Sequence, residues 1–97
     1  MVAYRIEFLP SARRSLARLP KRVQQQASRR IDGLALDPRP VASKQLSGDL
    51  REFRRLRIGD YRVVYLIQDD ALIVVAVAVG HRRDIYEQVL RRRGAPS

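Results

Sequence analysis

The sequence predicts an α+β fold in which helices cover both faces of a curved, mostly antiparallel four-stranded sheet. Alternating apolar segments on both sides of Gly59-Asp60 predict a tight hairpin, because this pair of residues favours a two-residue turn. Two segments with helical spacing precede the hairpin, and a third lies near the end of the chain. The expected order β-α-α-β-β-β-α fits a sandwich with an N-terminal helical hairpin on one face and a C-terminal helix on the other.

The first half of the chain supplies one strand and the helical hairpin. Residues 4–9 alternate well enough for a strand, and Pro10 marks the start of a short helix that ends at Pro20. Apolar residues recur at helical spacing between these prolines, at Ala12, Leu16 and Leu19. A second helix is expected over residues 21–36 and must stop before Pro38, because proline disfavours a helical residue ahead of it.

The second half supplies the other strands and the last helix. After a loop that holds Lys44, strands are expected over residues 52–58, 61–68 and 72–79. The last strand is apolar on both parities, which predicts that it is central and covered on both faces. A helix over residues 84–93 can cover the second face, with apolar side chains at Ile85, Tyr86, Val89 and Leu90. Residues 1–97 are expected to form one domain, with about 94–97 as a disordered tail.

The hairpin brings arginines together. If Gly59-Asp60 forms the loop, Arg57 faces Arg62, and Arg55 shares their face of the sheet. Like charges opposite each other destabilise a sheet, so this arrangement predicts an anion between them. Arginine binds phosphate well through its planar fork of donors, and the hairpin is therefore a candidate phosphate-binding surface.

The composition of the chain indicates a polyanionic partner. Its 97 residues carry 20 Lys+Arg against 10 Asp+Glu, a net charge of +10. The absence of cysteine excludes disulfides and cysteine-based zinc sites. No signal peptide is evident, and the longest apolar run, residues 71–79, is far shorter than the ~20 residues that span a bilayer. We expect a soluble, cytoplasmic protein without membrane contact.

Two motifs identify a family. The hairpin reads Arg55-x-Arg57-x-Gly-Asp-Tyr-Arg62-x-x-Tyr65, and the block Val79-Gly80-His81-Arg82-Arg83-Asp84-Ile85-Tyr86 follows it. With the order of elements, they resemble the RelE/ParE toxin superfamily of type II toxin–antitoxin systems over nearly the whole chain. The resemblance implies one of two functions: RelE-like members cleave mRNA in the ribosomal A site, whereas ParE-like members poison DNA gyrase. The fold alone does not choose between them, but a basic pocket that includes a tyrosine favours the ribonuclease.

The resemblance to RelE also implies catalytic roles, without metal or cofactor. The ribose 2′-OH attacks the adjacent phosphorus and leaves a 2′,3′-cyclic phosphate. Arg62 matches the arginine that stabilises the phosphorane, Arg82 the arginine near the leaving group, and Tyr86 the tyrosine that orients or stacks on the substrate. Arg55 stands where the family often has a strand lysine, and Phe53 occupies a second position that is basic in the family. The general base is therefore not assigned by the resemblance, because arginine holds its proton too tightly.

His81 is the alternative base. It is the only histidine, and the ordinary pKa of histidine, near ~6.5, suits proton transfer at neutral pH. A two-residue loop at Asp69-Asp70 would place it on the same face as Arg62. The competing interpretation is a histidine that caps the strand through backbone hydrogen bonds.

Further basic residues and partners complete the expectations. Arg57, Lys44 and Arg83 are candidate RNA contacts. The resemblance implies a cognate antitoxin, the ribosome and mRNA as partners, with DNA gyrase as the alternative target. An acidic antitoxin segment is expected to neutralise the arginine face and to displace the C-terminal helix together with Tyr86.

Overall fold

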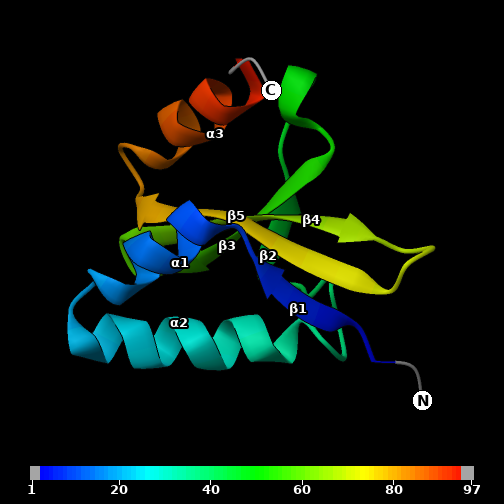
Figure 1. Cartoon of the computed structure of the whole chain (residues 1–97), viewed down its shortest axis with the longest axis horizontal. Coiled ribbons are helices and arrows are strands. Elements are labelled where there is room, and N and C mark those ends of the chain that lie inside the picture. The colour runs from blue at the N-terminus through cyan, green and yellow to red at the C-terminus, as the bar shows by residue number, and fades with distance from the viewer. Residues whose placement is uncertain (1–2, 95–97) are drawn as a thin grey trace.

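The computed structural model describes residues 3–94, which form a mixed sheet with helices on both faces (Figure 1). The strands are β1 (Arg5–Phe8), β2 (Ser43–Gln45), β3 (Phe53–Ile58), β4 (Tyr61–Gln68) and β5 (Ile73–His81). The helices are α1 (Pro10–Ala17), α2 (Lys21–Gly33) and α3 (Ile85–Gly94), with a single 3-10 turn at Gly48–Leu50. The sheet order is β1-β5-β4-β3-β2, and β1 runs parallel to β5 while the other pairs are antiparallel. The predicted α+β class and mostly antiparallel sheet are confirmed.

The described sheet has five strands, whereas the sequence predicted four. The additional strand, β2, lies in the segment that was expected to be a loop, and Ser43 and Lys44 pair with Leu56 and Arg55 of β3. Three polar residues carry no apolar alternation, so nothing in the segment itself indicates a strand. The segment becomes a strand because it pairs with the otherwise free edge of β3.

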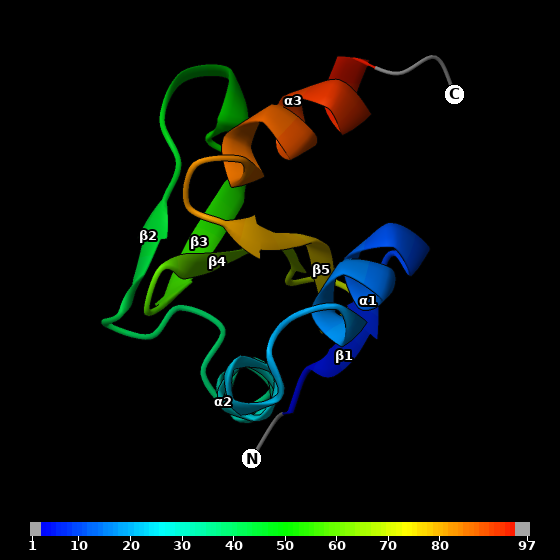
Figure 2. The same ribbon diagram turned by 90° about the vertical axis from the view of Figure 1, so that its left-hand side faces the viewer.

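Two hydrophobic cores lie on opposite faces of the sheet. Figure 2 shows α3 on one side and α1 and α2 on the other. The core under α1 and α2 includes Ala12, Ile31 and the fully buried Tyr65, whose hydroxyl donates a hydrogen bond of 2.8 Å to the carbonyl of Pro38. The core under α3 contains Phe53, Val64, Val77, Ala78, Ile85 and Val89. β5 contributes to both cores, so it is covered on both faces as predicted.

The β3–β4 hairpin has the predicted register. Ile58 pairs with Tyr61 and Arg57 pairs with Arg62, which leaves Gly59 and Asp60 as the loop. Gly59 has a φ of +59°, the left-handed conformation that glycine adopts without steric cost. The side chains of β3 and β4 therefore alternate as the sequence indicates.

The register between β4 and β5 changes once, at a β-bulge. Tyr65 pairs with Ala76 but Val64 pairs with Ala78, so Val77 is an extra residue in β5. One inserted residue reverses which face the following side chains occupy. The loop between β4 and β5 has four residues instead of the expected two, because Gln68 pairs with Ile73. Two additional loop residues do not change which face of the sheet the side chains of β5 occupy.

The C-terminal helix packs closely on β5. Ile85 and Val89 are fully buried, whereas Leu90 is 54% exposed and is not part of the buried face that was expected to include it. A Cβ atom at Gly80 would lie 2.8 Å from the side-chain amide nitrogen of Gln88, so glycine permits this approach. α3 continues through Gly94, and residues 95–97 of the expected tail lie outside the described residues. Among the described residues, no helix has the length and apolar character needed to span a bilayer.

Candidate functional site

Strand pairing collects four cations on the face of the sheet that α3 covers. Lys44 of β2 lies opposite Arg55 of β3, and Arg57 of β3 lies opposite Arg62 of β4. Arg55 is opposite Val64, which belongs to the core under α3, and this pairing places the whole row on the α3 side. The expected sharing of one face by Arg55, Arg57 and Arg62 is confirmed.

Arg62 is the buried member of this row, with only 8% of its surface exposed. Its Nη1 donates hydrogen bonds to the carbonyls of Gly59 (3.0 Å) and Tyr61 (2.9 Å). Burial lowers the pKa of Arg62, and the positive charges of Arg57 and Arg55 lower it further. The hairpin backbone thus fixes a guanidinium in a place where its charge is poorly solvated and repelled by its neighbours. An anion bound here would relieve both effects.

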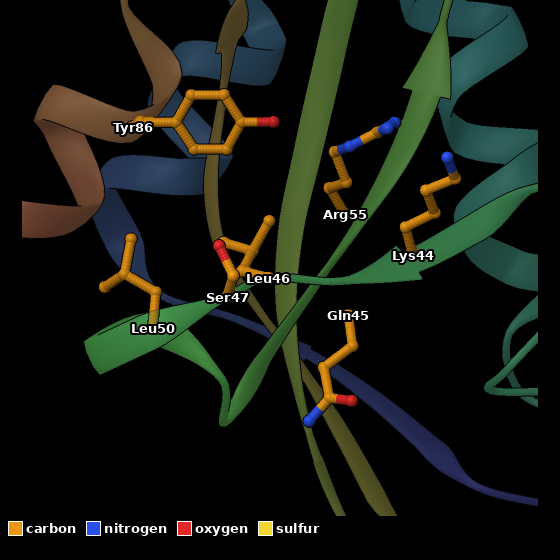
Figure 3. A pocket seen from close by; sticks show the side chains of 7 residues that line it. All are labelled: Lys44, Gln45, Leu46, Ser47, Leu50, Arg55 and Tyr86. Atoms are coloured by element: carbon orange, nitrogen blue, oxygen red, sulfur yellow. The ribbon is translucent and has the colours of Figure 1, made fainter.

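Arg55 faces a cavity of about 420 Å³ beside α3. The lining residues are Lys44, Gln45, Leu46, Ser47, Leu50, Arg55 and Tyr86 (Figure 3). The Nη1 atom of Arg55 is buried and has no hydrogen-bond partner among the described residues. A buried donor without a partner is unfavourable, and more so when it carries charge. The cavity is therefore suited to a ligand that brings an anionic acceptor to Arg55.

The same cavity also has apolar walls. Leu46 and Leu50 line it and pack against the core under α3, and Tyr86 does the same from the helix. In Figure 3 the Tyr86 hydroxyl points toward the side of the cavity where Arg55 and Lys44 lie. A ligand that combines a flat, weakly polar ring with a phosphate matches these two kinds of wall, and a nucleotide is such a ligand.

Arg82 lies at the margin of the basic row, in the turn between β5 and α3. Its backbone N–H donates to the carbonyl of Asp60 (2.8 Å), and its Nε lies 3.9 Å from a carboxylate oxygen of the same residue. This contact joins the β5–α3 turn to the tip of the hairpin. The charge of Arg82 also contributes to the lowered pKa of Arg62. Arg83, the next residue, is exposed.

His81 is not on the face that the sequence analysis expected. It pairs with Tyr61, and the two rings form an edge-to-face contact with centroids 5.7 Å apart. Gly80 takes the position opposite Arg62. The expectation that His81 shares a face with Arg62 is wrong because the bulge at Val77 reverses the parity of the end of β5. The Nδ1 atom of His81 accepts a hydrogen bond of 3.2 Å from the backbone N–H of Arg83.

The structure thus brings together most of the residues that the sequence singled out. Lys44, Arg55, Arg57 and Arg62 share a face, and Tyr86 covers it from α3. The sequence analysis did not find the second half of the cavity wall, formed by Gln45, Leu46, Ser47 and Leu50. Only the pairing of β2 with β3 would have indicated these residues. Within residues 3–94 no group of His, Cys, Asp or Glu side chains is arranged to hold a metal ion.

Comparison with known proteins agrees with this geometry. The family described as "ParE toxin of type II toxin-antitoxin system, parDE" matches residues 6–86. The protein named Toxin RelG of Mycobacterium tuberculosis is 36% identical over 86 residues, which cover 88% of this chain and 98% of that protein. The family match over residues 6–86 therefore includes the β3–β4 hairpin, the bulged strand β5 and the start of α3.

Solved structures give the same assignment. A chain of the toxin–antitoxin complex RelBE2 from Mycobacterium tuberculosis superimposes with a TM-score of 0.75 and 33% identity, covering 84% of this chain and 100% of that one. A chain of the archaeal RelE–RelB complex from Pyrococcus horikoshii gives a TM-score of 0.72 and 25% identity, covering 82% and 96%. The chain belongs to the RelE/ParE superfamily and is a RelE-like toxin of a type II toxin–antitoxin system.

Proposed function

We propose that this toxin is a ribosome-dependent endoribonuclease that cleaves mRNA in the cytoplasm without a catalytic metal ion. The substrate's own 2′-OH attacks the adjacent phosphorus, and the products carry a 2′,3′-cyclic phosphate and a 5′-hydroxyl. The observation that carries the proposal is the buried, unpartnered Nη1 of Arg55 at the cavity that Tyr86 also lines. A bound phosphodiester would supply the acceptor that this nitrogen lacks.

The other cations have distinct roles in this proposal. Arg62 stabilises the negative charge that develops on the phosphorane, because the carbonyls of Gly59 and Tyr61 hold its guanidinium in place before the substrate arrives. Arg82 lies beside the leaving 5′-oxygen, Tyr86 stacks on or orients a base, and Arg57 and Arg83 contact RNA phosphates. The names of two relatives, Toxin RelG and Toxin RelE of Mycobacterium tuberculosis, agree with a toxin of this kind.

We further propose that a cognate antitoxin holds this toxin inactive. The support is that similar solved structures are toxin–antitoxin complexes, RelBE2 and RelE–RelB. The net charge of +10 favours an acidic antitoxin segment, and attraction between the two would make association fast and sensitive to salt. The segment would neutralise the row of arginines on the α3 face.

A gyrase poison is the second candidate function, because the matching family is described as ParE toxin. A poison that acts only by binding has no need for a buried, preorganised cation beside a tyrosine. Inhibition without chemistry would also leave transcripts intact. The two functions therefore differ in which nucleic acid is broken.

The decisive experiment is primer extension on mRNA from cells that express the toxin, together with a test for gyrase-dependent DNA breaks. Cleavage should occur within translated codons and should depend on ribosomes when the reaction is reconstituted with purified parts. Arg62→Ala should abolish the cleavage bands, whereas Arg29→Ala, a change on the exposed part of α2, should not. Intact transcripts accompanied by gyrase-dependent breaks would overturn the proposal in favour of the second candidate.

A further inference from the structure

The proposed reaction needs a group that removes the proton from the 2′-OH. Arg55, Arg62 and Arg82 are unsuited to this role, because a guanidinium does not give up its proton readily. His81 has the right chemistry, but it faces Tyr61 on the opposite side of the sheet from Arg62. Phe53, at the second strand position that is basic in similar toxins, is buried in the core under α3. None of these residues therefore supplies the base.

Lys44 lies where such a base is needed. β2 places it opposite Arg55 and on the same face, and its side chain lines the cavity together with Arg55 and Tyr86. In Figure 3, Lys44 and Arg55 extend from neighbouring strands toward the same side of the sheet. Lys44 is exposed, so a substrate can reach its amine without a rearrangement of the core. The only other lysine of the chain, Lys21, begins α2 beneath the opposite face.

We propose that the Nζ atom of Lys44 is the general base of this toxin, an inference that rests on the proposed ribonuclease function. The neutral amine accepts the proton of the 2′-OH while that oxygen forms a bond to the adjacent phosphorus. The bond between phosphorus and the 5′-oxygen then breaks, and the departing oxygen takes a proton from solvent. Lys44 returns its proton to solvent, so the enzyme is unchanged after each cycle.

The surroundings of Lys44 fit this role. Arg55 faces it from β3 and Tyr86 from α3, and no carboxylate lines the cavity within the described part of the chain. The amine is therefore not held by an ion pair from the cavity wall. Arg55, with its unpartnered Nη1, can hold the phosphate while Lys44 acts on the neighbouring 2′-OH. Arg55 thus binds the charged phosphate, and Lys44 accepts the proton.

The test exploits the fact that arginine keeps the charge of lysine but does not give up its proton. Wild-type toxin, Lys44→Arg and the matched control Lys21→Arg are compared in single-turnover cleavage of mRNA on programmed ribosomes over a series of pH values. Lys44→Arg should bind ribosomes normally, cleave roughly 10²–10⁴-fold more slowly and lose the rise of rate with pH. Lys21→Arg should behave as wild type. Equal rates and equal pH profiles for Lys44→Arg and wild type would overturn the inference while leaving the proposed function intact.

A chemical rescue separates proton transfer from simple charge. The chain has no cysteine, so Lys44→Cys introduces a single thiol that can be modified before the toxin meets ribosomes. Aminoethylation of that thiol should restore cleavage with a pH profile displaced to lower pH, because the sulfur reduces the basicity of the new amine. A fixed trimethylammonium at the same thiol should not restore it. Equal restoration of cleavage by both reagents would overturn the inference. If the wild-type toxin cleaves no mRNA, the proposed function is overturned, and the inference with it.

Discussion

Arg57 and Arg62 lie directly opposite each other across the β3–β4 hairpin, and the charge of Arg57 lowers the pKa of Arg62. Two like charges directly opposite each other on a sheet are destabilising unless an anion lies between them. The buried member of the pair, Arg62, is held by backbone carbonyls, so it cannot swing away to relieve the repulsion. This arrangement supports the phosphate site of the proposed function.

This relationship predicts that Arg57→Gln stabilises the free toxin. Removing one of two like charges on facing strands should raise the free energy of unfolding by about 0.2–1 kcal/mol at low ionic strength, with a smaller gain at high salt. Denaturant unfolding at two salt concentrations measures the effect, with Arg29→Gln on the exposed part of α2 as the control. A destabilised Arg57→Gln variant at low salt would contradict the repulsion argument.

Arg62→Ala should slow cleavage by roughly 10²–10³-fold, the usual effect of removing one preorganised charge donor from a transition state. The measurement is the single-turnover rate on saturating ribosomes, so that weaker binding does not enter the result. Circular dichroism of the variant should match that of the wild type, because the Arg62 side chain lies outside both apolar cores. Cleavage at the wild-type rate would place the phosphate site elsewhere.

His81→Gln should leave the cleavage rate and its pH profile unchanged, because the ring packs against Tyr61 on the other face of the sheet. The same single-turnover assay measures the rate, and ribosome binding is measured separately. A slow variant that still binds ribosomes would assign proton transfer to His81. Such a result would also require β5 to shift its register on the ribosome.

Asp69 should contribute to acid stability by joining three segments of the chain. It accepts hydrogen bonds from the Tyr4 hydroxyl (2.6 Å) and from both terminal nitrogens of Arg39 (2.8 and 3.2 Å). Arg39, and then Tyr4, lower the pKa of Asp69 below its ordinary value of about 3.9. The contribution is therefore complete above that value and is lost as the pH falls through the lowered pKa of the folded state.

Unfolding experiments below pH ~4 test this contribution. The free energy of unfolding of the wild type should fall more steeply with decreasing pH than that of Asp69→Asn, which lacks the contribution at every pH. Asp70→Asn changes the neighbouring exposed carboxylate and should retain the wild-type slope. Equal slopes for wild type and Asp69→Asn would show that the contact does not persist in solution.

Antitoxin binding should loosen α3. Ile85 and Val89 of α3 are fully buried, but Leu90 is exposed. The helix therefore buries less apolar surface against the sheet than the sequence pattern indicated. A partner helix with a larger apolar face would displace it and carry Tyr86 away from the cavity. Hydrogen exchange of residues 84–93 should then be faster in the complex than in the free toxin. Equal protection in both states would leave masking of charge as the mechanism of inhibition.

The predictable parts of this molecule are those with a local cause. Gly59 in a two-residue turn sets the parity of β3 and β4, and this parity was enough to place Arg57 opposite Arg62. The bulge at Val77 has no such signal, because it lies within an unbroken apolar run in which every register looks alike. β2 has no signal either, since its polar residues become a strand only by pairing with β3. The wall of the cavity that β2 and the following residues form, including the position of Lys44, could therefore not be predicted.

The bulge makes the register of β5 as important to the chemistry as its composition. In a regular ladder with Val77 opposite Val64, Val79 would lie opposite Arg62, and His81 would lie on the same face of the sheet as Arg62. The bulge therefore places a glycine beside the arginine row and turns the only imidazole to the other face. A shift of the bulge past His81 would bring a second kind of proton-transfer group to the arginine face with no amino acid replaced by another.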